Sequence, residues 1–239
     1  MKNIKKKILG ITLARGNSKG IKKKNIISLC NKPLIFYTIS EALKSKFIND
    51  YIVSTDNLEI KKIATKYGAS VPFLRPKQLA KDTSSSVSAL QHAVNFMENK
   101  NKIKYDYVIE LMATNPLKIH DDIDSCIKKL FKTGADSVIA MHNLEDHHPA
   151  RIKKIVNDKI IDFCVSEKKE SRRQDLKPKA YIRSGSIYAL DRNYLMSRSE
   201  RYGSVNSRPY ILPTERAINI DTEADIYLAE YYLRMKNQS

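Results

Sequence analysis

The chain has 239 residues, of which 42% are hydrophobic and 29% charged, and this composition is typical of one soluble globular domain over residues 1–239. No apolar run approaches the length of a membrane span, and Arg15 interrupts the first apolar stretch too early for a secretory signal. The three cysteines are widely spaced and match neither a metal-ligand pattern nor a disulfide framework. We therefore expect a cytoplasmic protein with no membrane association.

The formal net charge is +17, from 43 basic and 26 acidic residues, which makes nucleic-acid binding a candidate function. Two observations oppose that interpretation: the basic residues are spread along the whole chain, and no tryptophan is present to stack on bases. The same charge would attract an anionic small-molecule substrate. We therefore predict no nucleic-acid partner and keep a basic nucleic-acid-binding protein as the alternative from a different class.

Strand and helix patterns alternate along the first 141 residues. Short apolar runs predict strands at residues 8–14, 51–56, 70–74, 107–111 and 137–141. Helical periodicity predicts helices at residues 33–46, 58–67, 87–97 and 121–131, the first opened by Pro33 and the second ended by Gly68. Strands separated by helices of this length form right-handed β-α-β units, so we expect an α/β fold with a mostly parallel sheet flanked by helices.

The pattern changes over residues 142–179, which are polar, basic and irregular, with short apolar pieces at 152–156 and 160–165. We expect an inserted arm here rather than more of the sheet. Strand patterns return at residues 181–190 and 210–212, and a helix at 222–235 completes the pattern, with acidic residues in its first turn.

The first strand runs directly into a loop that carries two glycines and several basic residues. Gly16 and Gly20 allow backbone angles that bring amide N–H groups close to an anion. The order of residues fits neither a P-loop nor a dinucleotide-binding fingerprint. Open α/β sheets bind ligands at strand ends, so we predict a polyphosphate site, with a solvated basic loop as the alternative. The positive charge of the predicted polyphosphate site would come from Arg15, Lys19 and Lys24.

Further blocks follow this loop in a fixed order over nearly the whole chain. With the loop itself, at residues 13–20 and 24–25, they are residues 53–56, residues 75–76 with 79–80 and 82–83, residues 145–149 and residues 218–223. Residues 172–174 and 185–188 fit the same series. The series resembles the signature of the acylneuraminate cytidylyltransferases, also called CMP-sialic acid synthetases. The resemblance implies a Rossmann-like fold of the nucleotide-diphospho-sugar transferase type. It also implies an enzyme that joins CTP to a nine-carbon 2-keto sugar acid such as N-acetylneuraminate, releasing pyrophosphate with Mg²⁺. A legionaminate-, pseudaminate- or octulosonate-type acid remains the alternative substrate.

The resemblance also implies roles for individual residues. Five residues near the first loop would hold the triphosphate and part of the nucleoside: Arg15, Ser18, Lys19, Lys24 and Asn25. Arg15 and Lys19 would be catalytic, because charge that develops at the α-phosphorus and on the leaving pyrophosphate must be stabilised. Arg75 and Ser86 match positions that contact the nucleotide, although a strand-end arginine such as Arg75 could equally form a surface ion pair.

The predicted metal site departs from the family pattern of two aspartates one residue apart. Here the pair is Asn219 and Asp221, whose side chains would face the same way on an extended segment. Asparagine offers a neutral carbonyl oxygen, so a Mg²⁺ site with one carboxylate is expected. Asp221 also fits the N-cap of the last helix, and both roles can hold at once. Met112 stands where the family often has a glutamine, so a changed substrate contact is expected there.

The arm at residues 142–179 resembles the dimerisation segment of the family. The resemblance implies a homodimer in which Arg151 and Arg173 reach the partner's site and hold the carboxylate of the sugar acid. His147 and His148 lack a third ligand at metal spacing, so we expect a structural or interface role for them. Arg183 lies one place from the arginine usual in the family, and no role is assigned to it.

Overall fold

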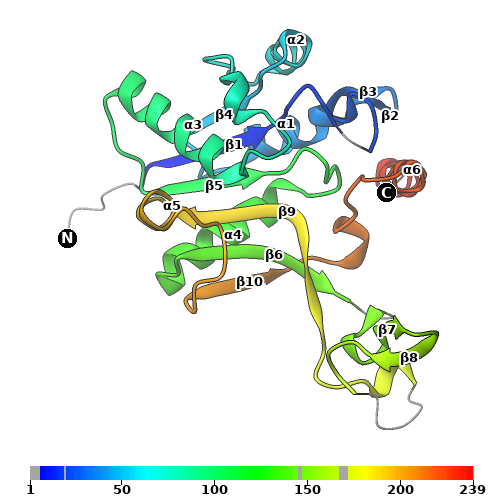
Figure 1. The fold of residues 1–239 in the computed structure, drawn as a ribbon. Helices are drawn as coiled ribbons and strands as arrows, with labels where there is room; N and C mark the ends of the chain where they lie inside the picture. Colours follow the sequence, from blue (N-terminus) through cyan, green and yellow to red (C-terminus); the bar gives the residue numbers. More distant parts are fainter. Residues whose placement is uncertain (1–5, 19, 145–146, 167–171, 239) are drawn as a thin grey trace.

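The computed structural model describes residues 6–18, 20–144, 147–166 and 172–238, and a six-stranded sheet flanked by helices forms its centre (Figure 1). The strand order is β10 (Ser207–Ile211), β6 (Ser137–Asn143), β9 (Tyr181–Asp191), β5 (Tyr107–Leu111), β1 (Ile8–Leu13) and β4 (Asp50–Ser54). Only β9 runs antiparallel to its neighbours, and the other adjacent pairs are parallel. The α/β fold with a mostly parallel sheet is therefore confirmed.

The helices begin and end at residues with recognisable capping chemistry. They are α1 (Leu34–Lys44), α2 (Leu58–Lys66), α3 (Ser86–Asn101), α4 (His120–Thr133), α5 (Arg192–Arg198) and α6 (Glu223–Gln238). The Asn57 side chain caps α2 by accepting from the Ile60 amide at 3.0 Å. Gly68, with a φ of +91°, follows the end of α2, as the sequence predicted.

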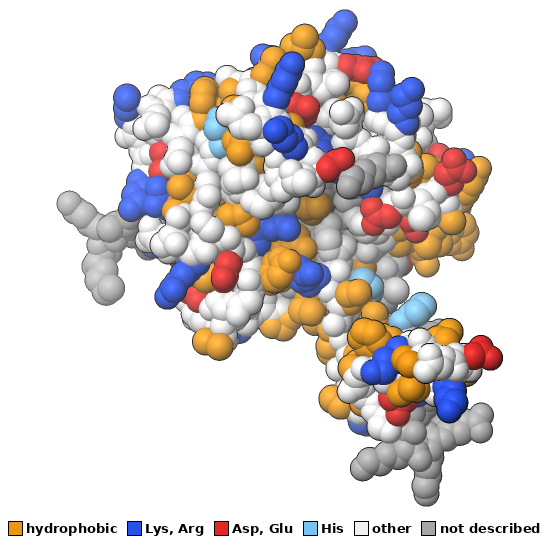
Figure 2. All heavy atoms as spheres, in the orientation of Figure 1, with side chains coloured by type: hydrophobic (Ala, Val, Ile, Leu, Met, Phe, Trp, Pro, Cys, Tyr) orange, Lys and Arg blue, Asp and Glu red, His pale blue; other side chains and the backbone are white. Residues whose placement is uncertain are grey.

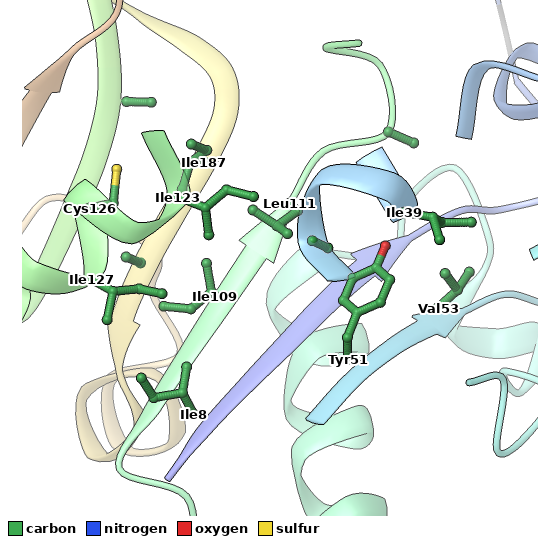
Figure 3. Packing of buried hydrophobic residues seen from close by; sticks show 14 of the residues in the cluster. Ile8, Ile39, Tyr51, Val53, Ile109, Leu111, Ile123, Cys126, Ile127 and Ile187 are labelled. Carbon is green, nitrogen blue, oxygen red and sulfur yellow. The ribbon is translucent and has the colours of Figure 1, made fainter. Parts of the chain in front are cut away.

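Both faces of the sheet are buried, which explains why its strands are continuous apolar runs. Successive residues of β5 enter opposite apolar layers, because side chains alternate across a strand. Val108 packs in the layer that contains Leu90 of α3, whereas Ile109 packs in the layer that contains Ile123 of α4 (Figure 3). A third cluster joins α6 to the start of α1. Among the described residues, no helix is both long and apolar enough to span a bilayer.

One expectation about secondary structure is wrong, and one helix was missed. Residues 70–74 form two isolated bridges to the β4 region, Ile52 with Ser70 and Thr55 with Leu74, and no continuous strand. Pro72 has no N–H to donate, so a regular ladder cannot continue through this segment. Helix α5 carries no strong periodic pattern and was not expected. The Asp191 carboxylate caps it by accepting from the Tyr194 amide at 2.9 Å.

The region expected as an arm lies outside the main sheet, although residues 142 and 143 still belong to β6. Its described part contains an antiparallel hairpin of β7 (Lys153–Val156) and β8 (Lys159–Asp162). The hairpin projects away from the body of the molecule (Figure 1). At its base the Leu144 amide donates to the Ala180 carbonyl at 2.9 Å. Two short strands, β2 (Ser28–Leu29) and β3 (Lys32–Pro33), form a separate small sheet before α1.

Candidate active site

A cleft of about 450 Å³ opens at the carboxyl ends of β1 and β5. The chain leaves β1 toward β4 and later returns to place β5 on the other side of β1, which makes this edge a topological switch point. Seven of the predicted ligand-binding residues line the cleft: Arg15, Ser18, Lys24, Asn25, Arg75, Ser86 and Asp221. Lys19 lies outside the described residues.

The loop after β1 is held in place by side chains from two other segments. The backbone amide of Gly16 donates to Asp56 Oδ1 at 2.9 Å, and Nδ2 of the buried Asn25 side chain donates to the Arg15 carbonyl at 2.9 Å. Gly16 does not have a positive φ, so a backbone angle that only glycine favours is not the reason for this residue. Close packing is the reason instead. A Cβ on Gly16 would lie 2.8 Å from the Asn57 side chain, and one on Gly20 would lie 3.0 Å from the Asp221 carbonyl.

Arg15 reaches across the mouth of the cleft. Its Nη1 donates to Asp82 Oδ1 at 2.7 Å, in the segment that leads into α3. Both side chains are partly exposed, so the ion pair contributes little stability and can rearrange when an anion binds.

Arg75 is buried, with 6% of its surface exposed, so the surface ion-pair interpretation is wrong. Its Nε donates to Ser54 Oγ at 3.0 Å, and its Nη2 donates to the Ser54 carbonyl at the end of β4. Burial lowers the pKa of Arg75, with Asp56 acting in the opposite direction, yet a guanidinium stays charged in proteins. A buried, fixed cation in a cleft favours an anionic ligand, which would replace lost solvation.

The N-terminus of α3 also faces the cleft. Ser86 is the first residue of this 16-residue helix, and Ser85 caps it by accepting from the Ser88 amide at 3.1 Å. Backbone N–H groups in the first turn of a helix and the positive end of the helix dipole favour bound anions. The loop after β1, Arg75 and this helix end therefore converge on one cleft, where their positive charge would favour an anion.

Asp221 lines the other edge of the cleft, and Asn219, which does not line it, contacts this carboxylate. Asp221 Oδ1 accepts from Lys24 Nζ at 2.7 Å, and Asp221 Oδ2 accepts from the Asn219 amide nitrogen. The expected cap role of Asp221 is wrong, because α6 begins two residues later, at Glu223, and the Asp221 carboxylate pairs with Lys24 and Asn219 instead. Asp225, in the first turn of α6, accepts at Oδ2 from the backbone amides of Asp221 and Thr222 at 3.0 and 2.7 Å. The Asp221 carboxylate remains 63% exposed at the cleft while it accepts from Lys24 and Asn219.

Asp221 would offer one carboxylate oxygen to a Mg²⁺ ion, whereas Asn219 turns its amide nitrogen, and not its oxygen, toward that carboxylate. Asn219 Oδ1 is buried and has no hydrogen-bond partner among the described residues. This oxygen packs beside Gly185, whose φ of +61° favours glycine. A Cβ built on Gly185 would lie 3.6 Å from Asn219 Oδ1. No cluster of three or more His, Cys, Asp or Glu side chains suited to a metal occurs in the described part of the chain. One carboxylate and one amide oxygen suffice for Mg²⁺, which keeps waters and binds phosphate oxygens.

A buried network beneath the cleft holds the segment that carries Asn219 and Asp221. The Asn115 side chain donates through Nδ2 to the carbonyls of Arg216 and Ile218 at 3.0 and 2.8 Å. Its Oδ1 accepts from Ser186 Oγ at 3.0 Å. The Ile220 amide donates to the Thr114 carbonyl at 2.8 Å. Asn115 therefore serves as a brace for the predicted metal pair.

Lys118 is buried below the same turn and does not line the cleft. Its Nζ donates to Thr38 Oγ1 and the Met112 carbonyl, both at 2.8 Å, and to the Asn115 carbonyl. Burial lowers the pKa of Lys118 to about 7, with Glu41 and Asp122 acting in the opposite direction. Met112 and Thr114 do line the cleft, so the change from the family's glutamine lies in the site, as expected.

Among the described lining residues that the sequence analysis missed, Glu110 is the one buried carboxylate. Glu110 is fully buried near the end of β5, and its Oε2 accepts from Arg201 Nη1 at 2.6 Å. Burial raises its pKa, with Arg201 acting in the opposite direction. The sequence signal that could have identified Glu110 is a carboxylate within an otherwise apolar strand. The Arg201 guanidinium lies 4.7 Å from the centre of the Tyr188 ring, and that of Arg183 lies 3.8 Å from the centre of the Tyr202 ring.

Arg151 and Arg173 do not lie in this cleft. Both belong to short 3-10 turns of the arm, and Arg173 lines a separate hollow together with His148. His148 Nδ1 accepts from the Ala150 amide at 3.2 Å, and its Nε2 lies 2.9 Å from the Pro178 carbonyl. These contacts brace the base of the arm.

Comparisons with known proteins agree with this geometry. The profile of the family described as Cytidylyltransferase matches residues 9–210. The chain is 33% identical over 234 residues to pseudaminic acid cytidylyltransferase of Campylobacter jejuni, covering 98% of this chain and 99% of the relative. It is 30% identical to CMP-N,N′-diacetyllegionaminic acid synthase of the same species, covering 97% of each.

A solved structure of CMP:2-keto-3-deoxy-manno-octonic acid synthetase complexed with CTP has the same fold. The TM-score is 0.70 at 17% identity, covering 96% of this chain and 99% of that one. The profile match and the relatives over nearly full length show that this chain is a nucleotidyltransferase of the cytidylyltransferase family, as its resemblance to the acylneuraminate cytidylyltransferases implied.

Proposed function

We propose that the protein joins CTP to a nonulosonic acid, a nine-carbon 2-keto sugar acid, giving the CMP-sugar acid and pyrophosphate. The observation that carries this proposal is the cleft in which Arg15, Lys24, Arg75 and the N-terminus of α3 meet at the switch point of the sheet. A triphosphate suits such a site, because several positive groups surround one hollow. The printed names of the sequence relatives supply the class of acid.

In the reaction, a hydroxyl oxygen of the sugar acid attacks the α-phosphorus of CTP. A phosphorus–oxygen bond forms, the bond between the α-phosphorus and the bridging oxygen breaks, and pyrophosphate leaves with that electron pair. The hydroxyl proton passes to solvent. Arg15, Arg75 and the amides at the start of α3 would stabilise the charge that moves to the leaving group. By the resemblance, Lys19 shares this role.

Asp221 and Asn219 would hold a Mg²⁺ ion at the edge of the cleft. The ion would neutralise phosphate charge and orient the triphosphate. Lys24 donates to Asp221 and to the Ile220 carbonyl, so this lysine keeps the carboxylate at the cleft. The Asn115 brace restrains the backbone on the other side of the pair.

We also propose a homodimer with shared active sites. The hairpin exposes apolar side chains, with Ile155 and Ile160 more than three-quarters exposed and Phe163 61% exposed. Figure 2 shows hydrophobic side chains gathered on the projecting arm. Packing of this surface on a second copy would bury them. Because Arg151 and Arg173 lie away from the cleft of their own chain, they would hold the sugar carboxylate in the partner's site.

We propose one catalytic domain over residues 1–239, with the arm as its dimerisation segment, acting in the cytoplasm. The three cysteines are free thiols, which suits a reducing compartment. On the face shown in Figure 2, Lys and Arg side chains are scattered among acidic and uncharged ones, which favours a small anionic substrate over a nucleic acid.

The test is release of pyrophosphate from CTP with a panel of acids: pseudaminic, N,N′-diacetyllegionaminic, N-acetylneuraminic and 2-keto-3-deoxy-manno-octonic acid. We expect turnover with at least one nine-carbon acid, confirmed by the mass of the CMP-sugar. Preference for the octonic acid would support the octulosonate alternative. No turnover with any acid, together with tight and salt-sensitive binding of RNA, would support the nucleic-acid alternative.

A further inference from the structure

Glu110 has an unusual position for a carboxylate. It lies near the carboxyl end of β5, lines the cleft, and has no exposed surface. Its Oε2 accepts from Arg201 at 2.6 Å, but its Oε1 is buried without a hydrogen-bond partner among the described residues. A buried acceptor without a donor costs stability, so such a group in a cleft points to a missing ligand.

The charges around Glu110 restrict what that ligand is. Arg201 balances the carboxylate, and Arg75 adds a second favourable interaction. Because two cations already balance the charge of Glu110, the ligand does not need a positively charged group. Phosphate and carboxylate groups would be repelled by Glu110. The part of the substrate that faces it must therefore be an uncharged hydrogen-bond donor.

The position of Glu110 indicates which substrate supplies the donor. The basic loop follows β1, and Arg75 is held at the end of β4, on the side of β1 away from β5. Glu110 lies on the opposite side, next to β9, where Arg201 and Tyr188 enclose it. The phosphates therefore belong on the β1–β4 side, and the acceptor substrate on the β5–β9 side.

We infer that Glu110 recognises the sugar acid of the proposed function, accepting at Oε1 a hydrogen bond from one of its hydroxyl or amide N–H groups. Arg201 positions the carboxylate for this contact. The carboxylate of the sugar acid is oriented away from Glu110 by like-charge repulsion. A site built around such an acceptor rejects analogues that lack the donor, because Oε1 then stays unpaired.

The test is steady-state kinetics of Glu110→Gln and Glu110→Leu with the panel acid that the wild type uses best. The glutamine keeps an acceptor and the shape of the side chain, whereas the leucine removes the acceptor. We expect kcat/KM for the acid to fall about 10- to 100-fold in Glu110→Leu and less in Glu110→Gln. The KM for CTP, and the Kd for CTP measured without the acid, should stay within about twofold of wild type.

Glu98→Gln is the matched control. Glu98 pairs with Arg192 at 2.7 Å, its side chain is only 13% exposed, and it does not line the cleft. We expect this variant to have wild-type kinetics for the acid. Thermal unfolding of all variants checks the fold, and Glu110→Gln decides the matter if Glu110→Leu does not fold.

Unchanged kinetics for the acid in both Glu110 variants, with an active wild type, would overturn this inference and leave the proposed function standing. A loss confined to CTP binding would overturn it as well, because Glu110 would then face the nucleotide. A wild type that uses none of the acids would overturn the proposed function and this inference together.

Discussion

Lys24 Nζ lies 2.7 Å from Asp221 Oδ1, although the two residues are 197 positions apart in the chain. The same ammonium donates to the Ile220 carbonyl at 2.9 Å. Lys24 follows the loop after β1, and Asp221 precedes α6, so this ion pair joins the proposed phosphate-binding and metal-binding edges of the cleft. A metal ion at Asp221 would therefore act on Lys24 as well.

Asp221→Asn should raise the Mg²⁺ concentration needed for half-maximal activity about tenfold or more, because no carboxylate would remain in the pair. Asn219→Asp should lower that concentration by restoring a second carboxylate. The Mg²⁺ requirement of each variant is measured as the rate of pyrophosphate release at increasing Mg²⁺ concentration, with both substrates saturating.

The control for this prediction is Asp225→Asn, which weakens the cap of α6. It should lower the melting temperature by a few degrees and leave the Mg²⁺ requirement unchanged. If Asp221→Asn behaves in the same way as Asp225→Asn, Asp221 does not bind the metal.

Lys19→Ala should reduce kcat about 100-fold or more while the melting temperature stays close to that of wild type. A loop lysine contributes little to the core, but its charge would act on the transition state. Lys23→Ala is the control, because Lys23 forms an exposed pair with Glu59 at 2.6 Å. Near-normal turnover of Lys19→Ala would remove Lys19 from the mechanism.

Arg173→Ala and Lys19→Ala should complement each other when subunits exchange. If Arg173 serves the partner's site, a mixed dimer has one site with both lesions and one intact site, and activity returns. The measurement is pyrophosphate release before and after exchange, with exchange verified by differently tagged subunits. A mixture that exchanges but stays inactive would show that Arg173 does not act in trans.

Lys118 should make stability depend on pH. Its pKa is lowered to about 7 in the folded protein, below the ordinary value of 10.5. Between these values the unfolded chain binds more protons, so this contribution to the free energy of unfolding rises with pH, by at most about 1.4 kcal/mol per unit. It is present in full above the ordinary pKa and is lost as pH falls toward 7.

Urea unfolding from pH 6 to pH 10 measures this contribution. Lys118→Met should lose the rise, whereas Lys44→Met, which removes a half-exposed ammonium, should keep it. Equal pH slopes for wild type and Lys118→Met would mean that the ammonium stays charged in its ring of three oxygen acceptors.

The amino-acid sequence alone determined the type of fold and the position of the anion site. Strands such as β5 are apolar at nearly every position, because helices cover both faces of the sheet, and this pattern is local. The basic loop after β1 is also local, since glycines and cations gather within a few residues at a strand end. Family motifs then located Arg75, Ser86 and Asp221, which share the cleft with that loop.

The tertiary structure alone decided how distant residues share burial and charge. From the sequence, Arg75 could equally form a surface ion pair. In the structure it is buried, and it donates to Ser54 at the end of β4. Glu110 reads as an anomaly in β5, and its partner Arg201 comes from 91 positions away. Local patterns record which face of an element is apolar, because that depends on near neighbours. They do not record which polar groups meet inside the fold, because those contacts depend on how the whole chain is packed.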